Sequence, residues 1–318
     1  MDYKFSLKGG SFSSTDVVEY KGELLVRKKI SFSEDREYGF YRWYGQYKKM
    51  LSMSKKYPEL IPAPNNFKVD DKTYSYTIPY YKDFINAYEY LNGPSANVEK
   101  FANGLFKILL KFQENVQNVP GDWLKLYWNE EVSLRIDFAY RYFKDIFDGK
   151  PYHIDGRVVE ISTKEKLVSV FNSEIPININ LVDTHGNLTL ENILYNPKED
   201  KILFIDLYEE NYFDVAVNDI SQLQQSCKYF YEDRNIANCK EIDRNVVCNF
   251  KSSKNLYLFN DLLEIFIHRN FSKQDEKLIK LFAASQFYRM IPFKFHHSKV
   301  HAKYFFLLAC KIMEDFRA

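Results

Sequence analysis

The segment 184–220 contains polar residues whose order and spacing suit phosphoryl transfer. It has a His-Gly pair that begins at His185, a carboxamide at Asn187 and a second carboxamide five residues later at Asn192. An apolar stretch then ends at Asp206. Amide and carboxylate oxygens are the hard ligands that Mg²⁺ takes in proteins. The segment therefore predicts a magnesium site made by Asn192 and Asp206.

This spacing resembles the catalytic loop and metal-binding strand of the aminoglycoside phosphotransferase and choline kinase family, which are relatives of the protein kinases. That family has H-G-D-x-x-x-x-N and, later, a strand that ends in I-D, whereas this chain has H-G-N-L-T-L-E-N and then F-I-D. The resemblance implies that Asn192 and Asp206 hold Mg²⁺ and that the metal bridges the phosphates of ATP. It also implies a catalytic loop that begins at His185 and a general base at position 187.

The general base position departs from the family pattern, because it holds Asn187 in place of Asp. A neutral amide can hydrogen-bond a hydroxyl, but it cannot accept the hydroxyl proton near pH 7. Nucleotide and metal binding are expected to survive, while turnover is expected to fall by about 10² to 10⁴-fold. Two explanations stay open: the residue was changed to trap a complex, or the chain is a natural pseudokinase.

The first eighty residues are expected to form the nucleotide-binding lobe that the resemblance implies. Their pattern predicts a strand near Phe5, a turn rich in Gly and Ser, a second strand over 16–20 and a third strand over 23–30. Small residues in the first turn would allow backbone N–H groups and hydroxyls to approach phosphate oxygens. The phosphate-binding residues expected in this turn are Gly10, Ser11 and Ser13.

The third predicted strand carries the expected nucleotide-binding lysine. Side chains alternate along a strand, so Val26, Lys28 and Ile30 share one face. The resemblance implies that Lys28 contacts the α- and β-phosphates and that Val26 packs against the adenine. Lys29 is the alternative if the register differs by one residue. The alternative without nucleotide binding is that Lys28 is a solvated lysine on an edge strand.

A helix is predicted over 33–51, because Ser33 is a suitable N-cap and acidic residues follow it. The resemblance implies that a glutamate from this helix orients Lys28. We expect Glu37 to have this role, with Glu34 as the alternative. Either carboxylate could instead be exposed and stabilised only by the helix dipole.

A hairpin is predicted over 66–69 and 73–79, with the turn at 70–72. The resemblance places the hinge between the two lobes directly after it. Backbone groups around Ile78 and Tyr80 are expected to contact the edge of the adenine.

The composition favours a large globular protein. The 318 residues are 46% hydrophobic and 27% charged, which is sufficient for a sizeable core, and the net charge is only +1. No polybasic run is present, and no stretch has the character of a membrane span or a signal peptide. We therefore expect a cytoplasmic protein without nucleic-acid or membrane partners, and the sequence leaves the oligomeric state open.

The four cysteines show no C-x-x-C spacing, so they are predicted to be free thiols that form neither a zinc site nor a disulfide framework. They are Cys227, Cys239, Cys248 and Cys310.

The remainder of the chain is predicted to be mainly helical. The expected helices cover 98–116, 132–147, 164–172, 256–269, 274–295 and 300–316, and short strands at 179–182 and 193–195 flank the catalytic loop. Arg289 and the histidines His296, His297 and His301 could line an acceptor pocket, and the histidines are not expected to bind a metal.

Together these observations predict an α+β, two-lobed protein kinase-like fold, with a β-rich nucleotide-binding lobe over 1–81 and a larger helical lobe over 82–318. The predicted activity is transfer of a phosphoryl group from ATP, with Mg²⁺, to a hydroxyl of a small molecule such as a sugar, polyol or amino alcohol. The first alternative is a nucleotide-binding pseudokinase with a scaffold or regulatory role. A second alternative is a kinase-like enzyme that acts on a protein.

Overall fold

A computed structural model describes residues 1–7, 13–31, 36–70, 72–208 and 214–317, and the side chains of 36–38 and 317 lie outside this description. By its internal contacts the chain divides into two compact units. The first unit comprises Met1–Tyr90 and His185–Glu210, and the second comprises Leu91–Thr184 and Asn211–Ala318. The segment that contains the predicted catalytic loop thus belongs with the N-terminal unit by its contacts. The lobe boundary at 81/82 stays a prediction.

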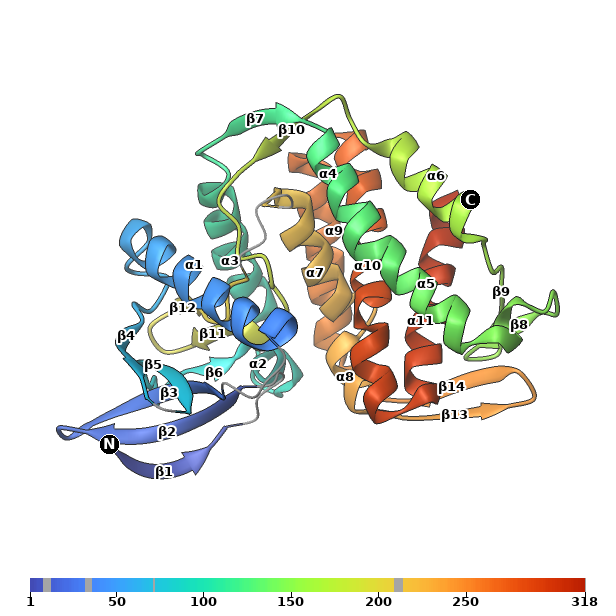
Figure 1. The fold of residues 1–318 in the computed structure, drawn as a ribbon. Coiled ribbons are helices and arrows are strands. Elements are labelled where there is room, and N and C mark those ends of the chain that lie inside the picture. The colour runs from blue at the N-terminus through green and yellow to red at the C-terminus, as the bar shows by residue number, and fades with distance from the viewer. Residues whose placement is uncertain (8–12, 32–35, 71, 209–213, 318) are drawn as a thin grey trace. The chain divides into compact units, whose positions relative to one another are not determined.

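The first unit is built on an antiparallel sheet with the strand order β1-β2-β3-β5-β4 (Figure 1). Its strands are β1 (Asp2–Ser6), β2 (Ser14–Tyr20), β3 (Glu23–Ser31), β4 (Asn65–Val69) and β5 (Thr73–Pro79). A two-residue turn joins β2 to β3, and both Lys21 and Gly22 have positive φ, 54° and 83°. This is the turn geometry that matches the right-handed twist of a hairpin. The strands predicted near Phe5 and over 16–20, 23–30, 66–69 and 73–79 are confirmed, whereas most of the predicted turn rich in Gly and Ser lies outside the described residues.

The other elements of the first unit carry the predicted catalytic segment. A π-helical turn, η1 (Arg36–Tyr41), leads into α1 (Arg42–Lys56), and the chain later forms β6 (Ile85–Asn86) and enters α2 (Ala87–Asn92). The returning segment forms the short helix η4 (Leu190–Asn192), β11 (Ile193–Asn196) and β12 (Lys201–Phe204). These strands make a second sheet with the order β12-β11-β6. The Phe204 N–H donates to the Leu60 carbonyl oxygen (2.8 Å), which ties β12 to the segment after α1.

The second unit is mainly helical. Its helices, after the end of α2, are α3 (Val98–Phe112), α4 (Asp122–Leu126), η2 (Tyr127–Val132), α5 (Ser133–Tyr142), η3 (Lys144–Phe147), α6 (Lys164–Glu174), α7 (Ala216–Cys227), α8 (Tyr231–Ile236), α9 (Lys254–Asn270), α10 (Lys273–His297) and α11 (Lys299–Arg317). Helix α10 packs along both α7 and α11 (Figure 1). Side-chain caps mark the N-terminal ends of α3 and α10. Asn97 accepts a hydrogen bond from the Lys100 N–H, and Ser272 forms a capping box with Asp275. No helix in the described ranges has the length and apolarity needed to cross a bilayer.

Two small sheets complete the second unit. Strands β7 (Gln117–Pro120) and β10 (Asn178–Leu181) pair with each other, and a sheet beside α11 has the order β13-β14-β8-β9. The strands of the latter are β8 (Tyr152–Ile154), β9 (Arg157–Val159), β13 (Asn238–Ile242) and β14 (Asn245–Asn249).

The prediction of four free thiols is wrong for one pair of cysteines. Cys239 and Cys248 are register partners across the β13–β14 hairpin, and a disulfide joins them. The physical reason is that strand pairing brings opposite residues together whatever their spacing in sequence. Cys227 and Cys310 are buried free thiols.

Candidate functional site

Strand β3 turns Lys28 into the interior of the first unit. The side chains of Val26, Lys28 and Ile30 are buried, whereas Arg27 and Lys29 are half-buried. This alternation agrees with the register predicted for β3. Lys28 is only 7% exposed, so its ammonium group needs a partner in the interior.

The partner of Lys28 is Asp206, the residue predicted to hold a metal. The Lys28 Nζ contacts the Asp206 Oδ1, and the Asp206 side chain is 30% exposed. Burial lowers the pKa of Lys28 to about 7, while the neighbouring carboxylate favours the charged ammonium. The pair therefore brings a buried cation and a partly exposed acid together.

Asp206 follows β12 in an unusual backbone conformation, with a φ of 62°. The left-handed region is disfavoured for residues other than glycine. Hydrogen bonds on each side hold it there: the Ile205 N–H donates to the Asn192 carbonyl oxygen (3.0 Å), and the Asn187 Nδ2 donates to the Asp206 carbonyl oxygen (3.3 Å). Strained backbone of this kind often occurs at functional sites.

The predicted catalytic loop is held by its own polar groups. The Asn187 N–H donates to the His185 Nδ1 (3.1 Å), and the Asn192 Nδ2 donates to the Asn187 carbonyl oxygen (2.8 Å). Because its nitrogen is used in this way, the amide of Asn192 keeps Oδ1 as the end that can bind a ligand. An amide oxygen and the Asp206 carboxylate form a donor set that suits Mg²⁺. The residues present therefore fit the predicted metal.

His185 lies in the interior with 0% of its surface exposed. Burial, together with the positive charge of Lys49, lowers its pKa from 6.5 to about 3. The imidazole is therefore neutral at physiological pH, and its Nδ1 accepts the Asn187 N–H. These properties suit a residue that positions the loop.

Gly186 is required by the local geometry. Its φ is +76°, and a Cβ at this position would overlap the Tyr208 carbonyl oxygen. Tyr208 is also bonded to the loop, because its N–H donates to the His185 carbonyl oxygen (3.0 Å). The loop and the segment after Asp206 therefore approach too closely for any side chain at Gly186.

The sequence interpretation missed two basic residues of α1 that lie against this loop. Lys49 is buried, and its Nζ is 3.5 Å from the position that a Cβ of Gly186 would take. The Arg42 guanidinium lies over the Tyr208 ring, 4.8 Å from its centroid. The available signal for Lys49 was helical spacing, because Met50 and Met53 are buried on the same helix.

The predicted adenine-binding residues lie in the first unit. Val26 pairs with Ile78 across β3 and β5, and both side chains are buried. The Tyr80 N–H donates to the Leu24 carbonyl oxygen (3.1 Å), so this amide is already used within the sheet. Ser13 is half-buried. Gly10, Ser11 and the Glu37 side chain lie outside the described parts of the chain, although the Glu37 backbone belongs to η1.

No protein-family model matches the sequence, and no curated protein matches it significantly. Solved structures do match. A protein assigned as a fructosamine-3-kinase from Haemophilus somnus 129PT aligns with a TM-score of 0.58 and 9% identity over 98% of this chain and 90% of that chain. The aminoglycoside phosphotransferase APH(4)-Ia aligns with a TM-score of 0.54 and 10% identity over 99% of this chain and 93% of that chain. This chain has the protein kinase-like fold.

The protein kinase-like fold confirms the predicted fold class, with a β-rich N-terminal sheet and a mainly helical C-terminal part. At these low identities the similarity establishes the fold and leaves the chemistry to the residues of the site.

Proposed function

We propose that this protein is an ATP- and Mg²⁺-dependent phosphotransferase that acts on a hydroxyl of a small molecule. The observation that carries the proposal is the contact between the buried Lys28 and Asp206. In a protein kinase-like fold, a strand lysine and an acid at the end of a later strand serve the phosphates and the metal. The sequence predicts Lys28 as the phosphate-binding lysine and Asp206 as a metal ligand, and the two residues are in contact within the first unit.

Each predicted residue has a role in this proposal. Asn192 and Asp206 would hold Mg²⁺, and the bound metal would neutralise charge on the phosphates. Lys28 would exchange part of its contact with Asp206 for the α- and β-phosphates, and Glu37 would orient it. Further nucleotide contacts are assigned to the phosphate-binding turn and the adenine-binding residues: Gly10, Ser11, Ser13, Val26, Ile78 and Tyr80.

Asn187 would meet the acceptor hydroxyl. Its Nδ2 donates to the Asp206 carbonyl oxygen, so its Oδ1 is the end that can accept a hydrogen bond from the hydroxyl. This contact orients the acceptor, but the amide does not take its proton. Phosphoryl transfer has a loose transition state, so positioning alone supports a reduced rate. We therefore expect this protein to be a slow enzyme.

A small-molecule acceptor is proposed because of the H-G start of the loop and the names of the two structural neighbours, a fructosamine-3-kinase and an aminoglycoside phosphotransferase. Both names indicate polyhydroxylated, amine-bearing acceptors. We propose a sugar, polyol or amino alcohol of this kind for the present protein. A net charge of +1 supports the absence of a nucleic-acid partner.

A nucleotide-binding pseudokinase is the second candidate, and Asn187 is the observation that favours it. In that case the protein would bind MgATP and act as a scaffold or regulator without turnover. The lobe assignment, 1–81 and 82–318, applies to both candidates.

The proposed cytoplasmic location requires its own test, because disulfides such as Cys239–Cys248 are rare in reducing compartments. Cell fractionation combined with thiol labelling of the isolated protein would measure both the compartment and the state of this pair.

The experiment that separates the two functions compares the present sequence with Asn187→Asp. Product formation from MgATP is measured by mass spectrometry against sugars, aminated sugars, polyols and amino alcohols, and nucleotide binding is measured by thermal shift. A phosphotransferase gives a phosphorylated product that increases by about 10² to 10⁴-fold in Asn187→Asp. A pseudokinase binds nucleotide and gives no product with either residue. Failure of both forms to bind nucleotide would refute both proposals.

A further inference from the structure

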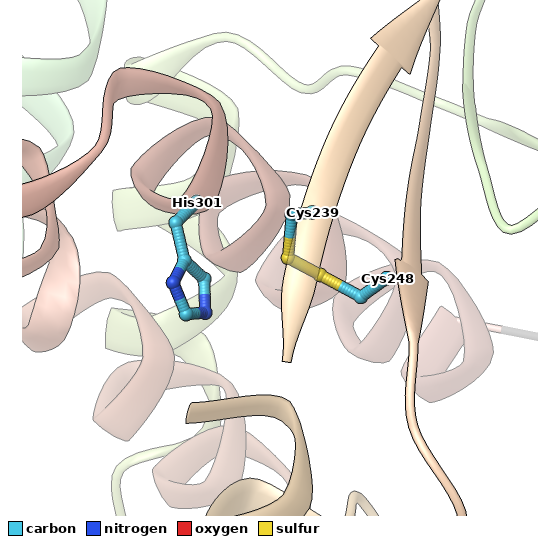
Figure 2. Close-up of side chains that lie close together, drawn as sticks. All are labelled: Cys239, Cys248 and His301. Atoms are coloured by element: carbon cyan, nitrogen blue, oxygen red, sulfur yellow. A yellow bond between two sulfur atoms is a disulfide. The ribbon is translucent and has the colours of Figure 1, made fainter. Parts of the chain in front are cut away.

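Three metal-binding side chains lie together in the second unit, outside the proposed catalytic residues. Cys239 is on β13, Cys248 is on β14 and His301 is in the first turn of α11. One donor atom from each residue lies within 4.8 Å of the other two. Figure 2 shows the His301 ring beside the two sulfur atoms.

The hairpin backbone holds the two cysteines opposite each other. Their Cα atoms are 4.2 Å apart, and the neighbouring pairs Lys240–Val247 and Glu241–Val246 continue the ladder. The disulfide is therefore added to a pairing that backbone hydrogen bonds already define. Reduction would leave the two sulfurs as close neighbours on the same hairpin.

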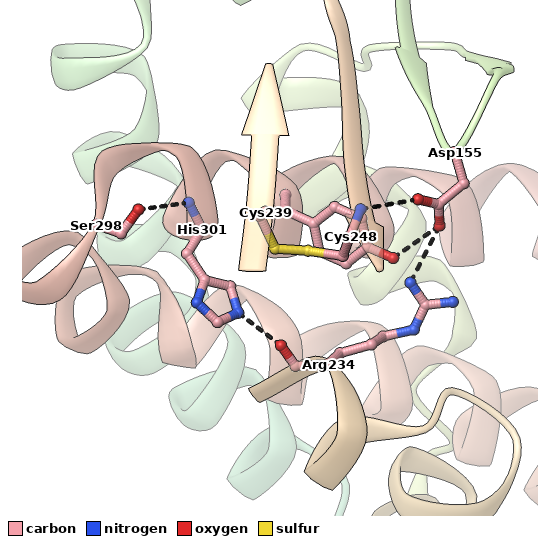
Figure 3. Close-up of a disulfide and its surroundings, with 7 residues drawn as sticks. Asp155, Arg234, Cys239, Cys248, Ser298 and His301 are labelled. Atoms are coloured by element: carbon pink, nitrogen blue, oxygen red, sulfur yellow. Dashed lines mark hydrogen bonds and ion pairs between the residues drawn. A yellow bond between two sulfur atoms is a disulfide. The ribbon is translucent and has the colours of Figure 1, made fainter. Parts of the chain in front are cut away.

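Hydrogen bonds connect both sides of the cluster to the segment around Arg234 (Figure 3). The Asp155 Oδ1 accepts the Cys248 N–H (3.2 Å), and its Oδ2 accepts from Tyr304 Oη (2.8 Å) and Arg234 Nη1 (3.2 Å). The His301 Nε2 contacts the Arg234 carbonyl oxygen (2.8 Å). Shared partners thus position the hairpin and the imidazole together.

An ion pair fixes the hairpin to α11 close to His301. The Lys303 Nζ is 2.8 Å from the Glu241 Oε2, and Lys303 is only 8% exposed. Glu241 and Cys239 belong to the same strand, while Lys303 and His301 belong to the same helix. The distance between the cysteines and His301 is therefore maintained by contacts other than the disulfide.

We propose that Cys239, Cys248 and His301 form a zinc site in the reduced protein and that the disulfide closes this site. Two thiolates and one imidazole are ligands that Zn²⁺ takes in tetrahedral sites, and a water molecule would occupy the fourth position. Zinc carries no redox chemistry of its own, so the oxidation state of the cysteines alone decides whether the site exists.

The opening step is thiol–disulfide exchange with an external dithiol. One thiolate of the dithiol attacks a sulfur of the Cys239–Cys248 bond, and its second thiolate then resolves the mixed disulfide. The dithiol becomes a cyclic disulfide and the protein gains two thiols, so two electrons and two protons are transferred. Zn²⁺ then displaces both thiol protons. Cys239 is only partly buried, which gives a small dithiol access to the bond.

His301 would change its partner when the metal binds. Figure 3 shows Nε2 on the side of the ring that faces the cysteines, where it contacts the Arg234 carbonyl oxygen. Binding of Zn²⁺ by this nitrogen would replace that contact. The disulfide links two strands that the 243–244 turn already joins, whereas the metal would also link the hairpin to α11.

The test uses the full chain, reduced with dithiothreitol and then freed of reductant without oxygen. Zn²⁺ affinity is measured by competition with a chromogenic chelator, and Co²⁺ is used to detect thiolate-to-metal charge transfer. Cys239→Ser and His301→Ala test the ligands. Matched controls are Cys310→Ser, which removes a buried free thiol, and His297→Ala, which removes an exposed histidine at the end of α10.

The proposal predicts one Zn²⁺ per reduced chain, a thiolate band with Co²⁺ and little binding to the oxidised chain. Cys239→Ser and His301→Ala should weaken binding at least about tenfold, since each removes a metal ligand, and the controls should bind as the parent does. Zinc should also raise the melting temperature of the reduced parent. Equal binding by the oxidised and reduced chains, or loss of binding in a control, would overturn the proposal. Absence of binding by the reduced parent would overturn it as well, provided that its circular dichroism is unchanged from that of the oxidised chain.

Discussion

The Nζ of Lys28 contacts the Oδ1 of Asp206, which lies 178 residues later in the chain. The contact joins the inward face of β3 to the residue that follows β12. A second link, from the Phe204 N–H to the Leu60 carbonyl oxygen, joins β12 to the segment after α1. These links explain why 185–210 belongs with the N-terminal sheet by its contacts, and they bring the proposed phosphate and metal ligands into one unit.

Replacement of Lys28 by Met should weaken MgATP binding at least about tenfold, because a charge-assisted contact with the phosphates is lost. The readout is the increase in melting temperature that saturating MgATP produces. Lys29→Met is the matched control, since Lys29 is the next residue of β3 and is half-buried on the other face. An increase in melting temperature that is equal in the parent and Lys28→Met would show that Lys28 does not contact the nucleotide. Loss of the increase only in Lys29→Met would assign that contact to Lys29.

Asp206→Asn should remove most of the magnesium dependence of nucleotide binding, because a neutral amide is a weaker ligand for a hard cation than a carboxylate. Isothermal titration of ATP with and without Mg²⁺ measures this difference. We expect Mg²⁺ to strengthen ATP binding to the parent and to Asp83→Asn, an exposed control, but to have little effect on Asp206→Asn. The same magnesium effect in all three proteins would exclude Asp206 as a ligand.

Gly186→Ala should destabilise the first unit more than Gly22→Ala does. Both glycines have positive φ, +76° and +83°, so an alanine at either position costs about 1 kcal/mol in backbone energy. Only at Gly186 would the new Cβ overlap another group, the Tyr208 carbonyl oxygen, which adds about 1–3 kcal/mol. Urea unfolding of the two variants measures the difference. Equal losses in the two variants would show that the close approach at Gly186 is absent.

His185 should make the protein less stable in mild acid. Its pKa is about 3 when folded and 6.5 when unfolded, so between these values the unfolded chain binds a proton that the folded chain does not. The unfolding free energy should therefore fall as the pH drops below about 6.5, with a contribution of up to about 1.4 kcal/mol per pH unit from this residue.

Urea unfolding at pH 7 and pH 5 tests this dependence in the parent, in His185→Gln and in the exposed control His297→Gln. His185→Gln should show a smaller loss between the two pH values, whatever its absolute stability. If His185→Gln and the parent lose the same amount, the buried imidazole is not the group that titrates.

The face of β3 could be predicted from sequence because a strand has a strict two-residue period. Val26 and Ile30 identified the buried face, so Lys28 followed as the inward lysine and Lys29 as the alternative. The strands and turns of the N-terminal sheet are local features, and their signals are local as well.

The β13–β14 hairpin and its disulfide could not be predicted in the same way. Its turn uses Asp243 and Arg244, which have positive φ values of 47° and 62° without a glycine. Hairpin turns of this kind usually have the sequence Asn-Gly or Asp-Gly, so Asp-Arg did not indicate a hairpin. Without the register, the nine-residue separation of Cys239 and Cys248 says nothing about their contact.

Lys49 was missed for a different reason. Its spacing from Met50 and Met53 places Lys49 near the buried side of α1. A charged residue is nevertheless expected on the exposed face, because burial of a lysine depends on tertiary contacts. Its position against Gly186 became evident only once α1 and the loop were placed in one unit.

We propose that this chain transfers the γ-phosphoryl group of ATP to a small-molecule hydroxyl. The most direct measurement is ³¹P NMR of Asn187→Asp incubated with MgATP and a mixture of aminated sugars, polyols and amino alcohols, beside the double variant Asn187→Asp/Asp206→Asn. We predict a new phosphomonoester signal that grows in step with ADP, requires the acceptor mixture and is absent in the double variant. ADP formation without a phosphomonoester, or a phosphomonoester that forms equally in the double variant, would contradict this activity.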